Sequence, residues 1–164
     1  MPEPKYSAVV ITVSDSCSRG EREDRSGPAT AEVLQQHGFW VPPQYRVIVP
    51  DDQPAIEEQL LAFIDSVHLI VTTGGTGVGK RDVTPEATRA VCSKFVEGIP
   101  EKMRAVGSKN NPLAALSRGL CGVRERTMIL NLPGSPSGAV DSLQAVIDIL
   151  PHALDLLVGN APHE

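Results

Sequence analysis

The sequence predicts an α/β fold: a three-layer, doubly wound, mostly parallel sheet with helices on both faces. Three short apolar runs, at 7–13, 68–73 and 127–132, have the length and the β-branched and aliphatic composition of buried strands. Segments with a helical spacing of apolar residues lie at 55–65 and 143–157. Strands that are apolar throughout and alternate with helices are typical of a parallel sheet that is covered on both faces.

A further strand and a helix are expected between the first two apolar runs. QYRVIV at 44–49 is the fourth strand candidate. In 55–65 the apolar residues recur at the i, i+4, i+7, i+8 positions of one helix stripe. Asp52 is expected to cap this helix, and Pro54 is tolerated in its first turn.

The second half of the chain is patterned less evenly. Thr84 and Pro85 are expected to form the cap and the first turn of a helix. The segment 93–119 is weakly patterned and is interpreted as a helical excursion. Near the end, 143–157 keeps one apolar face, and Pro151 is expected either to start a new helix or to kink the old one.

Length, charge and cysteine content limit the possible classes of protein. The 164 residues suit one domain, 1–164, with a single substantial core. A net charge of -5 does not favour nucleic acid or an anionic membrane surface as a partner. The polar N-terminus and the short first apolar run lack the pattern of a signal peptide or a membrane span, so we expect a cytoplasmic protein. Free, reduced thiols are expected at Cys17, Cys92 and Cys121.

Three unusual loops follow predicted strands. They are SDSCSRGEREDRSGP at 14–28, GGTGVGKRDVTP at 74–85 and PGSPSG at 133–138. In open α/β sheets, ligands bind at the carboxyl ends of the strands, where loops run into helix N-termini. These loops are therefore predicted to form the ligand site.

The middle loop partly matches a nucleotide-binding P-loop. Gly74, four residues, Gly79 and Lys80 begin the pattern G-x-x-x-x-G-K-[ST]. The next residue should be a Ser or Thr that holds magnesium, but it is Arg81. This departure argues against a P-loop.

The position of the following helix argues against a P-loop as well. Pro85 disfavours an α conformation at Thr84, so the helix starts about one turn too late. The loop is instead interpreted as a flexible glycine loop whose backbone N–H groups converge on an anion. The alternative is a tight strand-to-helix turn that merely needs glycine. The residues expected to bind the anion are Gly74, Gly75, Thr76 and Gly77.

The loop PGSPSG repeats this logic on a smaller scale. Gly134 and Ser135 lie between a strand and a helix whose N-terminus offers free N–H donors to a phosphate. An ordinary turn with Ser137 as the helix cap is the alternative, and the sequence alone does not decide between them.

Carboxylates near these loops indicate a magnesium site. Asp51 follows the strand that ends at Val49, and Asp82 lies just beyond the glycine loop. Carboxylates beside phosphates repel them unless a hard cation lies between, so Asp51 and Asp82 are the Mg²⁺ candidates. Phosphate charge would be neutralised locally by Lys80, Arg81, Arg104 and Arg118, although a solvated surface role is the default for each of them.

Taken together, the motifs resemble the MogA/MoaB family of molybdenum-cofactor biosynthesis proteins, to which the G domains of gephyrin and of plant Cnx also belong. The resemblance covers nearly the whole chain in the right order. The segments that carry it are TVSDSC (12–17), EDRSG (23–27), VPDD (49–52), TTGGTG (72–77), RDVTPEAT (81–88), LSR (116–118) and LNLPGSP (130–136). One departure is Val78-Gly79-Lys80, where the family often has a different tripeptide, for example one that contains Pro.

The resemblance implies a homotrimer that binds molybdopterin, a dithiolene pterin phosphate. The implied reaction is molybdopterin adenylyl transfer: Mg-ATP and molybdopterin give adenylyl-molybdopterin and pyrophosphate, with no covalent protein nucleophile. Asp51 and Asp82 match the functional aspartates of the family and would organise magnesium. The implied substrate-binding residues are Asp15, Asp24, Ser26, Gly27, Gly74, Gly75, Thr76, Gly77, Gly134 and Ser135.

The resemblance leaves two functions open. The first is the adenylyltransferase, with Mg²⁺ and with ATP as co-substrate, and Asp51 and Asp82 favour it. The second is a non-catalytic molybdopterin-binding or carrier protein of the MoaB type. In both cases the chain lacks a fused molybdate-insertion module, so a separate insertion protein is the expected partner.

Overall fold

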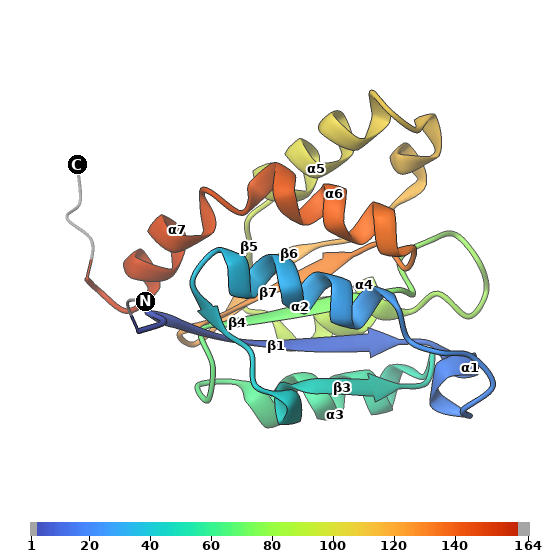
Figure 1. Cartoon of the computed structure of the whole chain (residues 1–164), viewed down its shortest axis with the longest axis horizontal. Helices are drawn as coiled ribbons and strands as arrows, with labels where there is room; N and C mark the ends of the chain where they lie inside the picture. Colours follow the sequence, from blue (N-terminus) through green and yellow to red (C-terminus); the bar gives the residue numbers. More distant parts are fainter. Residues whose placement is uncertain (1–2, 161–164) are drawn as a thin grey trace.

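Residues 3–160, the part of the chain that the computed structural model describes, form a seven-stranded, mostly parallel sheet with helices on both faces (Figure 1). This arrangement confirms the predicted fold class. The strands are β1 (Tyr6–Val13), β2 (Phe39–Trp40), β3 (Arg46–Val49), β4 (Leu69–Thr73), β5 (Lys94–Phe95), β6 (Cys121–Arg124) and β7 (Thr127–Leu132).

The sheet has a parallel part and an antiparallel edge. On one side β1 pairs with both β2 and β3, and on the other side β4 and then β7 follow, all of them parallel. The register places Val13 opposite Val49, and Thr73 opposite both Thr12 and Leu132. The carboxyl ends of β1, β3, β4 and β7 therefore lie side by side. Beyond β7, β6 pairs antiparallel with β7, and β5 pairs antiparallel with β6 and forms the edge of the sheet.

The helices lie in two layers (Figure 1). The alternating side chains of β1 show the division: Ala8 and Val10 pack in the core with α2, α5, α6 and α7, whereas Val9 and Ile11 pack with α3 and α4. The helices are α1 (Asp15–Ser18), α2 (Ser26–Gln36), α3 (Gln53–Phe63), α4 (Thr84–Val91), α5 (Gly98–Ser108), α6 (Pro136–Val146) and α7 (Leu150–Leu157), with the 3-10 turns η1 (Pro43–Tyr45) and η2 (Pro112–Leu116).

The apolar runs at 7–13, 68–73 and 127–132 coincide with β1, β4 and β7 to within one residue at each end. Only the second part of the candidate at 44–49 is a strand, since Pro43–Tyr45 forms η1. The helix predicted at 55–65 is α3, which begins two residues earlier. Its cap is Asp52, as predicted: the side chain accepts a hydrogen bond from the Ala55 N–H at 3.1 Å.

Proline positions also account for two helix starts. Pro151 lies in the first turn of α7, so it starts a new helix. Helix α4 begins at Thr84, after the glycine loop, as the sequence predicts. The expectation that Thr84 caps it was wrong, however, because Val83 is the capping residue and the Thr84 hydroxyl instead donates to the Gly74 carbonyl at 2.9 Å. The weakly patterned segment 93–119 contains α5, the expected helical excursion, together with β5 and η2.

A buried polar network fixes α4 against the sheet. The Asn131 side chain on β7 donates to the hydroxyls of Thr72 on β4, at 3.0 Å, and Thr88 on α4, at 2.9 Å. Its carbonyl oxygen accepts from the Leu120 N–H at 3.0 Å. Because these groups are buried, each needs its partner, and the network holds α4 and the loop that precedes it in one position.

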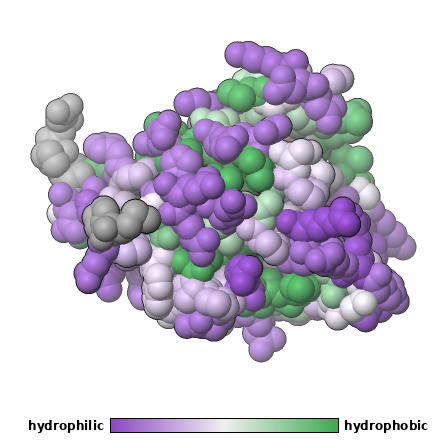
Figure 2. Space-filling view, in the orientation of Figure 1, coloured by the Kyte–Doolittle hydropathy of each residue, from purple (hydrophilic) through white to green (hydrophobic). Residues whose placement is uncertain are grey.

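The surface of the described residues is mixed in character. On the face shown in Figure 2, hydrophobic side chains occur in small groups among hydrophilic ones. Within residues 3–160, every helix is too short or too polar to cross a lipid bilayer.

Candidate functional site

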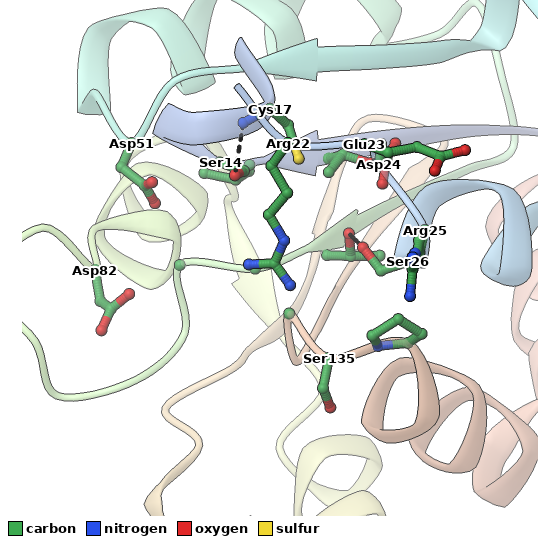
Figure 3. Close-up of a pocket in the computed structure, with 17 residues that line it drawn as sticks. Ser14, Cys17, Arg22, Glu23, Asp24, Arg25, Ser26, Asp51, Asp82 and Ser135 are labelled. Carbon is green, nitrogen blue, oxygen red and sulfur yellow. Dashed lines mark hydrogen bonds between the residues drawn. The ribbon is translucent and has the colours of Figure 1, made fainter. Parts of the chain in front are cut away.

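The three loops singled out by the sequence meet at the carboxyl edge of the parallel strands. Backbone hydrogen bonds link two of the loops to the neighbouring strand: the Ser14 N–H donates to Val49 O at 2.9 Å, and the Gly74 N–H to Leu132 O at 3.1 Å. The loops enclose a cavity of about 340 Å³ (Figure 3). Of the predicted site residues, it brings together Asp24, Ser26, Asp51, Gly74, Gly75, Asp82, Gly134 and Ser135.

A second cavity of about 470 Å³ adjoins the first. Its walls come from the glycine loop, from α5 and η2, and from the first turns of α6, and they include the predicted residues Thr76 and Gly77. The two cavities therefore adjoin where two of the predicted anion loops approach each other. The residues that line both are Gly75, Asp82, Gly134 and Ser135.

The conformation of the loop after β4 requires glycine. Gly74 has a φ of 95° and Gly75 a φ of 69°, both in the left-handed region that L-residues with side chains rarely adopt. A Cβ atom on Gly74 would collide with the Val13 carbonyl, and one on Gly75 with the Thr84 hydroxyl. The Thr84 N–H also donates to Gly75 O at 3.1 Å. The start of α4 thus fixes these two peptides at the border of both cavities.

The loop does not have the geometry of a P-loop. Gly79 and Lys80 lie in a turn before α4, so no helix N-terminus follows them directly. The Arg81 side chain points away toward the loop after β1, where Nε and Nη2 donate to the two Asp15 oxygens at 2.9 and 3.0 Å. This bidentate ion pair connects two of the three loops across the site.

Asp15 and Asp51 hold each other in place. The Asp15 N–H donates to Asp51 Oδ2, and the Asp51 N–H donates to Asp15 Oδ1, both at 3.0 Å. The Arg81 guanidinium lowers the pKa of Asp15. Burial raises the pKa of Asp51, and the negative charges of Asp15 and Asp82 raise it further. The positive charge of Arg81 offsets these effects only in part. Asp15 lines neither cavity and contacts the site through Asp51 and Arg81.

Asp82 lies at the border of the two cavities. One of its side-chain oxygens accepts from the Gly79 N–H at 2.9 Å. Arg118 holds its backbone, since Nη2 donates to Asp82 O at 2.9 Å and Nε donates to Gly77 O at 2.7 Å. Arg118 also pairs with Glu86 on α4 and lowers the pKa of that carboxyl. Arg118 thus shapes the loop around Asp82.

The first motif of the sequence contributes mostly to the framework of the cavity. Asp24 accepts from the Thr12 hydroxyl at 2.7 Å and from the Gly27 N–H at 2.9 Å, so both of its oxygens are used. Gly27 is buried against these two side chains, lines neither cavity and leaves no room for a Cβ atom. The Ser26 and Thr73 hydroxyls share a hydrogen bond of 2.9 Å.

Two cations of the cavity were missed by the sequence reasoning. Arg22 and Arg25 line the first cavity, and Figure 3 shows the Arg22 side chain extending into it. Among residues 3–160, neither guanidinium makes a hydrogen bond or an ion pair with another side chain or backbone group. Of the four cations expected at a phosphate, Arg81 and Arg118 are engaged as described, and Arg104 donates to the carbonyls of Ser117 and Gly119. Arg22 and Arg25 could have been identified from the sequence by their positions on either side of Asp24 in the first loop.

The charges of the site fit Mg²⁺ as part of a complex with a substrate. Asp51 and Asp82 both line the first cavity, and the charge of Asp82 raises the pKa of Asp51. Within the described chain, no group of three or more His, Cys, Asp or Glu side chains is arranged to hold a metal ion. Mg²⁺ commonly uses one or two carboxylates and completes its coordination with water and substrate phosphates. The donor set present here suits that mode of binding.

The N-terminus of α6 forms the border opposite the glycine loop. Ser135, not Ser137, is the cap of this helix, and its hydroxyl accepts from the Gly138 N–H at 3.1 Å. Gly134 lies against Gly74. A parallel α/β sheet with glycine loops, a helix N-terminus and two adjoining cavities at its carboxyl edge defines a protein that binds anionic small molecules.

Comparison with known proteins gives the family. Residues 9–152 match the family described as "Probable molybdopterin binding domain". The chain is 42% identical to the molybdopterin adenylyltransferase of Helicobacter pylori (strain 26695) over 153 residues, which cover 92% of this chain and 87% of that protein. It is 39% identical to the molybdopterin adenylyltransferase of Escherichia coli (strain K12), with 85% and 72% covered. The crystal structure of the molybdopterin biosynthesis enzyme MoaB from Thermus thermophilus superposes with a TM-score of 0.88 at 48% identity, covering 97% and 99%. The chain therefore belongs to the molybdopterin-binding domain family.

Proposed function

We propose that this protein is a molybdopterin adenylyltransferase, which joins the adenylyl group of Mg-ATP to molybdopterin and releases pyrophosphate. The observation that carries the proposal is the pair of adjoining cavities that share Gly75, Asp82, Gly134 and Ser135. A transferase for two small substrates needs two binding spaces that meet where the bond forms. The relatives named as molybdopterin adenylyltransferases, at 39–42% identity, support the same activity.

The proposed reaction is an in-line displacement at phosphorus. An oxygen of the molybdopterin phosphate attacks the α-phosphorus of ATP, and the bond from that phosphorus to the bridging oxygen of the β-phosphate breaks. Pyrophosphate leaves with the electron pair. Both reactants are negatively charged, so the protein contributes by positioning them in line and by offsetting their charge. No protein nucleophile takes part.

Residues at the border of the cavities would perform these tasks. Gly74 and Gly75 present backbone to a phosphate at close range, because side chains are excluded there. The N-terminus of α6, with Gly134 and Ser135, offers backbone N–H donors to the second phosphate. Arg22 and Arg25 supply positive charge on the opposite side of the first cavity.

Asp51 and Asp82 are the residues that would hold Mg²⁺. When bound, the ion would neutralise charge on the phosphates of ATP and on the leaving pyrophosphate. Asp15 keeps the Asp51 carboxylate oriented through the two reciprocal hydrogen bonds. Arg118 keeps Asp82 in position by holding the backbone on both sides of the turn, at Gly77 O and Asp82 O.

The proposal includes the setting of the enzyme. We expect a cytoplasmic homotrimer that passes adenylyl-molybdopterin to a separate molybdate-inserting protein. Light scattering of the purified protein would measure its oligomeric state, and a mass of about one chain would contradict the trimer.

Single-turnover adenylylation is the experiment that tests the function. Purified protein, freshly prepared molybdopterin and Mg-ATP should give adenylyl-molybdopterin and pyrophosphate, and Asp82→Asn should reduce the rate at least about a hundredfold, the scale of losing one preorganised charge at a reacting centre. Asp148→Asn, which changes an exposed carboxylate outside both cavities, is the matched control and should keep wild-type activity.

Two other results would contradict the proposal. Tight binding of molybdopterin without formation of product would support the carrier of the MoaB type. Brisk ATP hydrolysis in the absence of any pterin would point to a nucleotidase. Equal activity of Asp82→Asn and wild type would remove Asp82 from the mechanism while leaving the reaction in place.

A further inference from the structure

Asp15 and Arg81 connect the two carboxylates that would hold Mg²⁺. Asp15 Oδ1 accepts from the Asp51 N–H and from Arg81 Nη2, both at 3.0 Å, so one oxygen joins both partners. Asp15 Oδ2 accepts from Arg81 Nε at 2.9 Å, and the Asp15 N–H donates to Asp51 Oδ2 at 3.0 Å. Arg81 directly precedes Asp82 in the chain. A continuous series of contacts and bonds therefore runs from Asp51 through Asp15 and Arg81 to Asp82.

The turn that contains Arg81 also carries the Asp82 carboxylate. The Asp82 N–H donates to Gly79 O at 3.1 Å, and Asp82 Oδ2 accepts from the Gly79 N–H at 2.9 Å. Arg118 holds one side of this turn, at Gly77 O and Asp82 O. The side chain of Arg81 holds the other side by reaching the loop after β1. Loss of either anchor would let the Asp82 carboxylate move relative to the rest of the site.

The contact between Asp15 and Arg81 is not a contact with the cavities. Neither residue lines the first or the second cavity. The Arg81 side chain is 67% exposed, and exposed ion pairs contribute little to the stability of a fold. A bidentate pair that spans two loops of the site is therefore better explained by what it holds in place than by a gain in stability.

The spacing of two carboxylates matters more to Mg²⁺ than to most cations. Mg²⁺ needs near-ideal octahedral geometry with ligands at about 2.0–2.1 Å, whereas Ca²⁺ accepts irregular sets of oxygen ligands. Asp51 and Asp82 lie on separate loops at the same side of the first cavity (Figure 3). Arg22 and Arg25 also line this cavity, so the phosphates of Mg-ATP would lie between the arginines and the metal. A fixed separation of the two aspartates is then a condition for binding the ion.

We propose that the ion pair of Asp15 and Arg81 sets the separation of Asp51 and Asp82 for Mg²⁺, which makes Arg81 a positioning residue for the metal of Mg-ATP. The inference rests on the proposed function for the presence of Mg-ATP. By its charge alone, Arg81 opposes the metal, because a cation beside these carboxylates repels a second cation. Positioning and charge therefore predict opposite effects when Arg81 is replaced by a neutral residue.

Calorimetric titration of the full chain with ATP tests the proposal, once in EDTA and once in excess Mg²⁺, without any pterin. The ratio of the two dissociation constants measures how much the metal tightens binding, and a direct effect of Arg81 on the nucleotide cancels in it. Mg²⁺ should tighten binding to wild type. Arg81→Gln should reduce the ratio about tenfold, the scale of one lost charge-assisted contact, whereas a pure effect of charge would increase it. Arg81→Lys keeps the charge without the two-pronged geometry and should give an intermediate ratio.

Two controls separate geometry from general effects. Arg126→Gln removes a guanidinium of similar exposure, 70%, that lies near Asp65 and lines neither cavity, so its ratio should equal that of wild type. With Ca²⁺ in place of Mg²⁺, Arg81→Gln should change the ratio much less, because Ca²⁺ has the same charge and tolerates a wider range of ligand positions. In a double-mutant cycle, Asp15→Asn combined with Arg81→Gln should lose no more than the larger single loss, since the two side chains act as a pair.

The results that would overturn the inference are equally definite. They are an unchanged or larger ratio for Arg81→Gln, equal losses with Mg²⁺ and Ca²⁺, and a wild-type chain that binds ATP equally well with and without Mg²⁺. If wild type forms adenylyl-molybdopterin and Arg81→Gln keeps the ratio, the transferase stands and the role of Arg81 falls. If Arg81→Gln loses the tightening by Mg²⁺ but wild type forms no adenylylated product, the role of Arg81 stands and the transferase falls.

Discussion

Arg22 is the residue whose contribution to the first cavity is most directly measurable. It extends into the cavity and, within residues 3–160, has no counter-ion, so its charge is available to a phosphate. Arg22→Ala should raise the KM for ATP about tenfold, the scale of one charge-assisted hydrogen bond, and Arg22→Lys should raise it less.

Arg19→Ala is the matched control for this substitution. Arg19 lies three residues earlier, pairs with Glu21 and lines neither cavity, so its removal should leave the KM unchanged. Steady-state kinetics at two salt concentrations would measure both variants. The same increase in KM for Arg19→Ala and Arg22→Ala would show a general effect of surface charge instead of a contact with the substrate.

Asp51 links the charge of the site to the stability of the fold. Its pKa is raised by burial and then by the charges of Asp15 and Asp82, so folding favours the neutral form. The contribution of this carboxyl to the free energy of unfolding is fully present below its ordinary pKa of 3.8. This contribution is lost as the pH rises through the raised pKa of the folded state. At neutral pH, the ionised Asp51 side chain therefore makes the folded state less stable.

Asp51→Asn should consequently be more stable than wild type at pH 7, by roughly 0.3–1 kcal/mol for a partly screened charge. The amide oxygen of the new side chain can still accept from the Asp15 N–H. Urea unfolding at pH 7 and near pH 4 would test this, because the difference should shrink at the lower pH. The variant should also lose adenylyl transfer. A variant that is less stable than wild type at pH 7 would show that the hydrogen bond outweighs the repulsion.

The sequence indicated the carboxylates of the site more completely than its cations. Asp51 and Asp82 could be placed from the strands and loops that precede them, because the carboxyl ends of parallel strands meet at one edge. The direction of an arginine side chain in a loop follows no periodicity, so Arg22 and Arg25 were not distinguished from Arg81 and Arg118. Those two proved to be engaged within the chain, by Asp15 and by the glycine loop and Glu86.

At the scale of elements, the loop from β4 to α4 depends on glycine for two separate reasons, and a pair of variants separates them. Gly20 and Gly75 both have a positive φ, of 73° and 69°, but only Gly75 has neighbours that a Cβ atom would strike. Gly20→Ala should cost about 1 kcal/mol for the left-handed backbone and should keep full activity. Gly75→Ala should lower the free energy of unfolding by that amount and by about 1–3 kcal/mol more for the clash with Thr84. It should also reduce the adenylylation rate at least about tenfold.

Thermal or urea unfolding of the two variants, together with the adenylylation rate, measures both effects. Because the positive φ is common to both positions, the difference between the variants reports the crowding at the border of the cavities. Equal losses of stability would mean that Thr84 moves aside without cost, and the loop would then be more adaptable than its hydrogen bonds indicate.

Elements with a strong apolar period were predictable, and short edge elements were not. β4 and β7 are buried along their whole length, and β1 is buried at every position except Ser7, so their composition alone identified them. β6 is a four-residue strand whose connection to β7 is Glu125-Arg126, with Glu125 at a φ of 51°. This turn lacks the Asn-Gly or Asp-Gly sequence by which a hairpin is usually recognised. β2 and β5 have two residues each, too few to show any alternation.

At the scale of the whole molecule, the sheet separates two hydrophobic cores, and each core has one cysteine whose labelling can measure how often that core opens. Cys121 is buried in the core with α2, α5, α6 and α7, whereas Cys92 packs against the core with α3 and α4. Burial raises the pKa of Cys92 to about 11 and that of Cys121 to about 12, from 9.0. At pH 8, the fraction of reactive thiolate falls by about a hundredfold and about a thousandfold, respectively.

Thiol labelling of the native protein at pH 8 should therefore show one fast cysteine, Cys17, which is half-buried and lines the first cavity. Cys17→Ser should remove the fast phase, and Mg-ATP should slow it in wild type, since the proposed nucleotide site covers that residue. Cys92 and Cys121 should react only when their cores open. If both cores open in one cooperative step, the two residues will label at the same rate when each is measured by mass spectrometry. Faster labelling of Cys92 would show that the layer of α3 and α4 opens by itself, and three equally fast thiols would contradict the burial that the structure gives them.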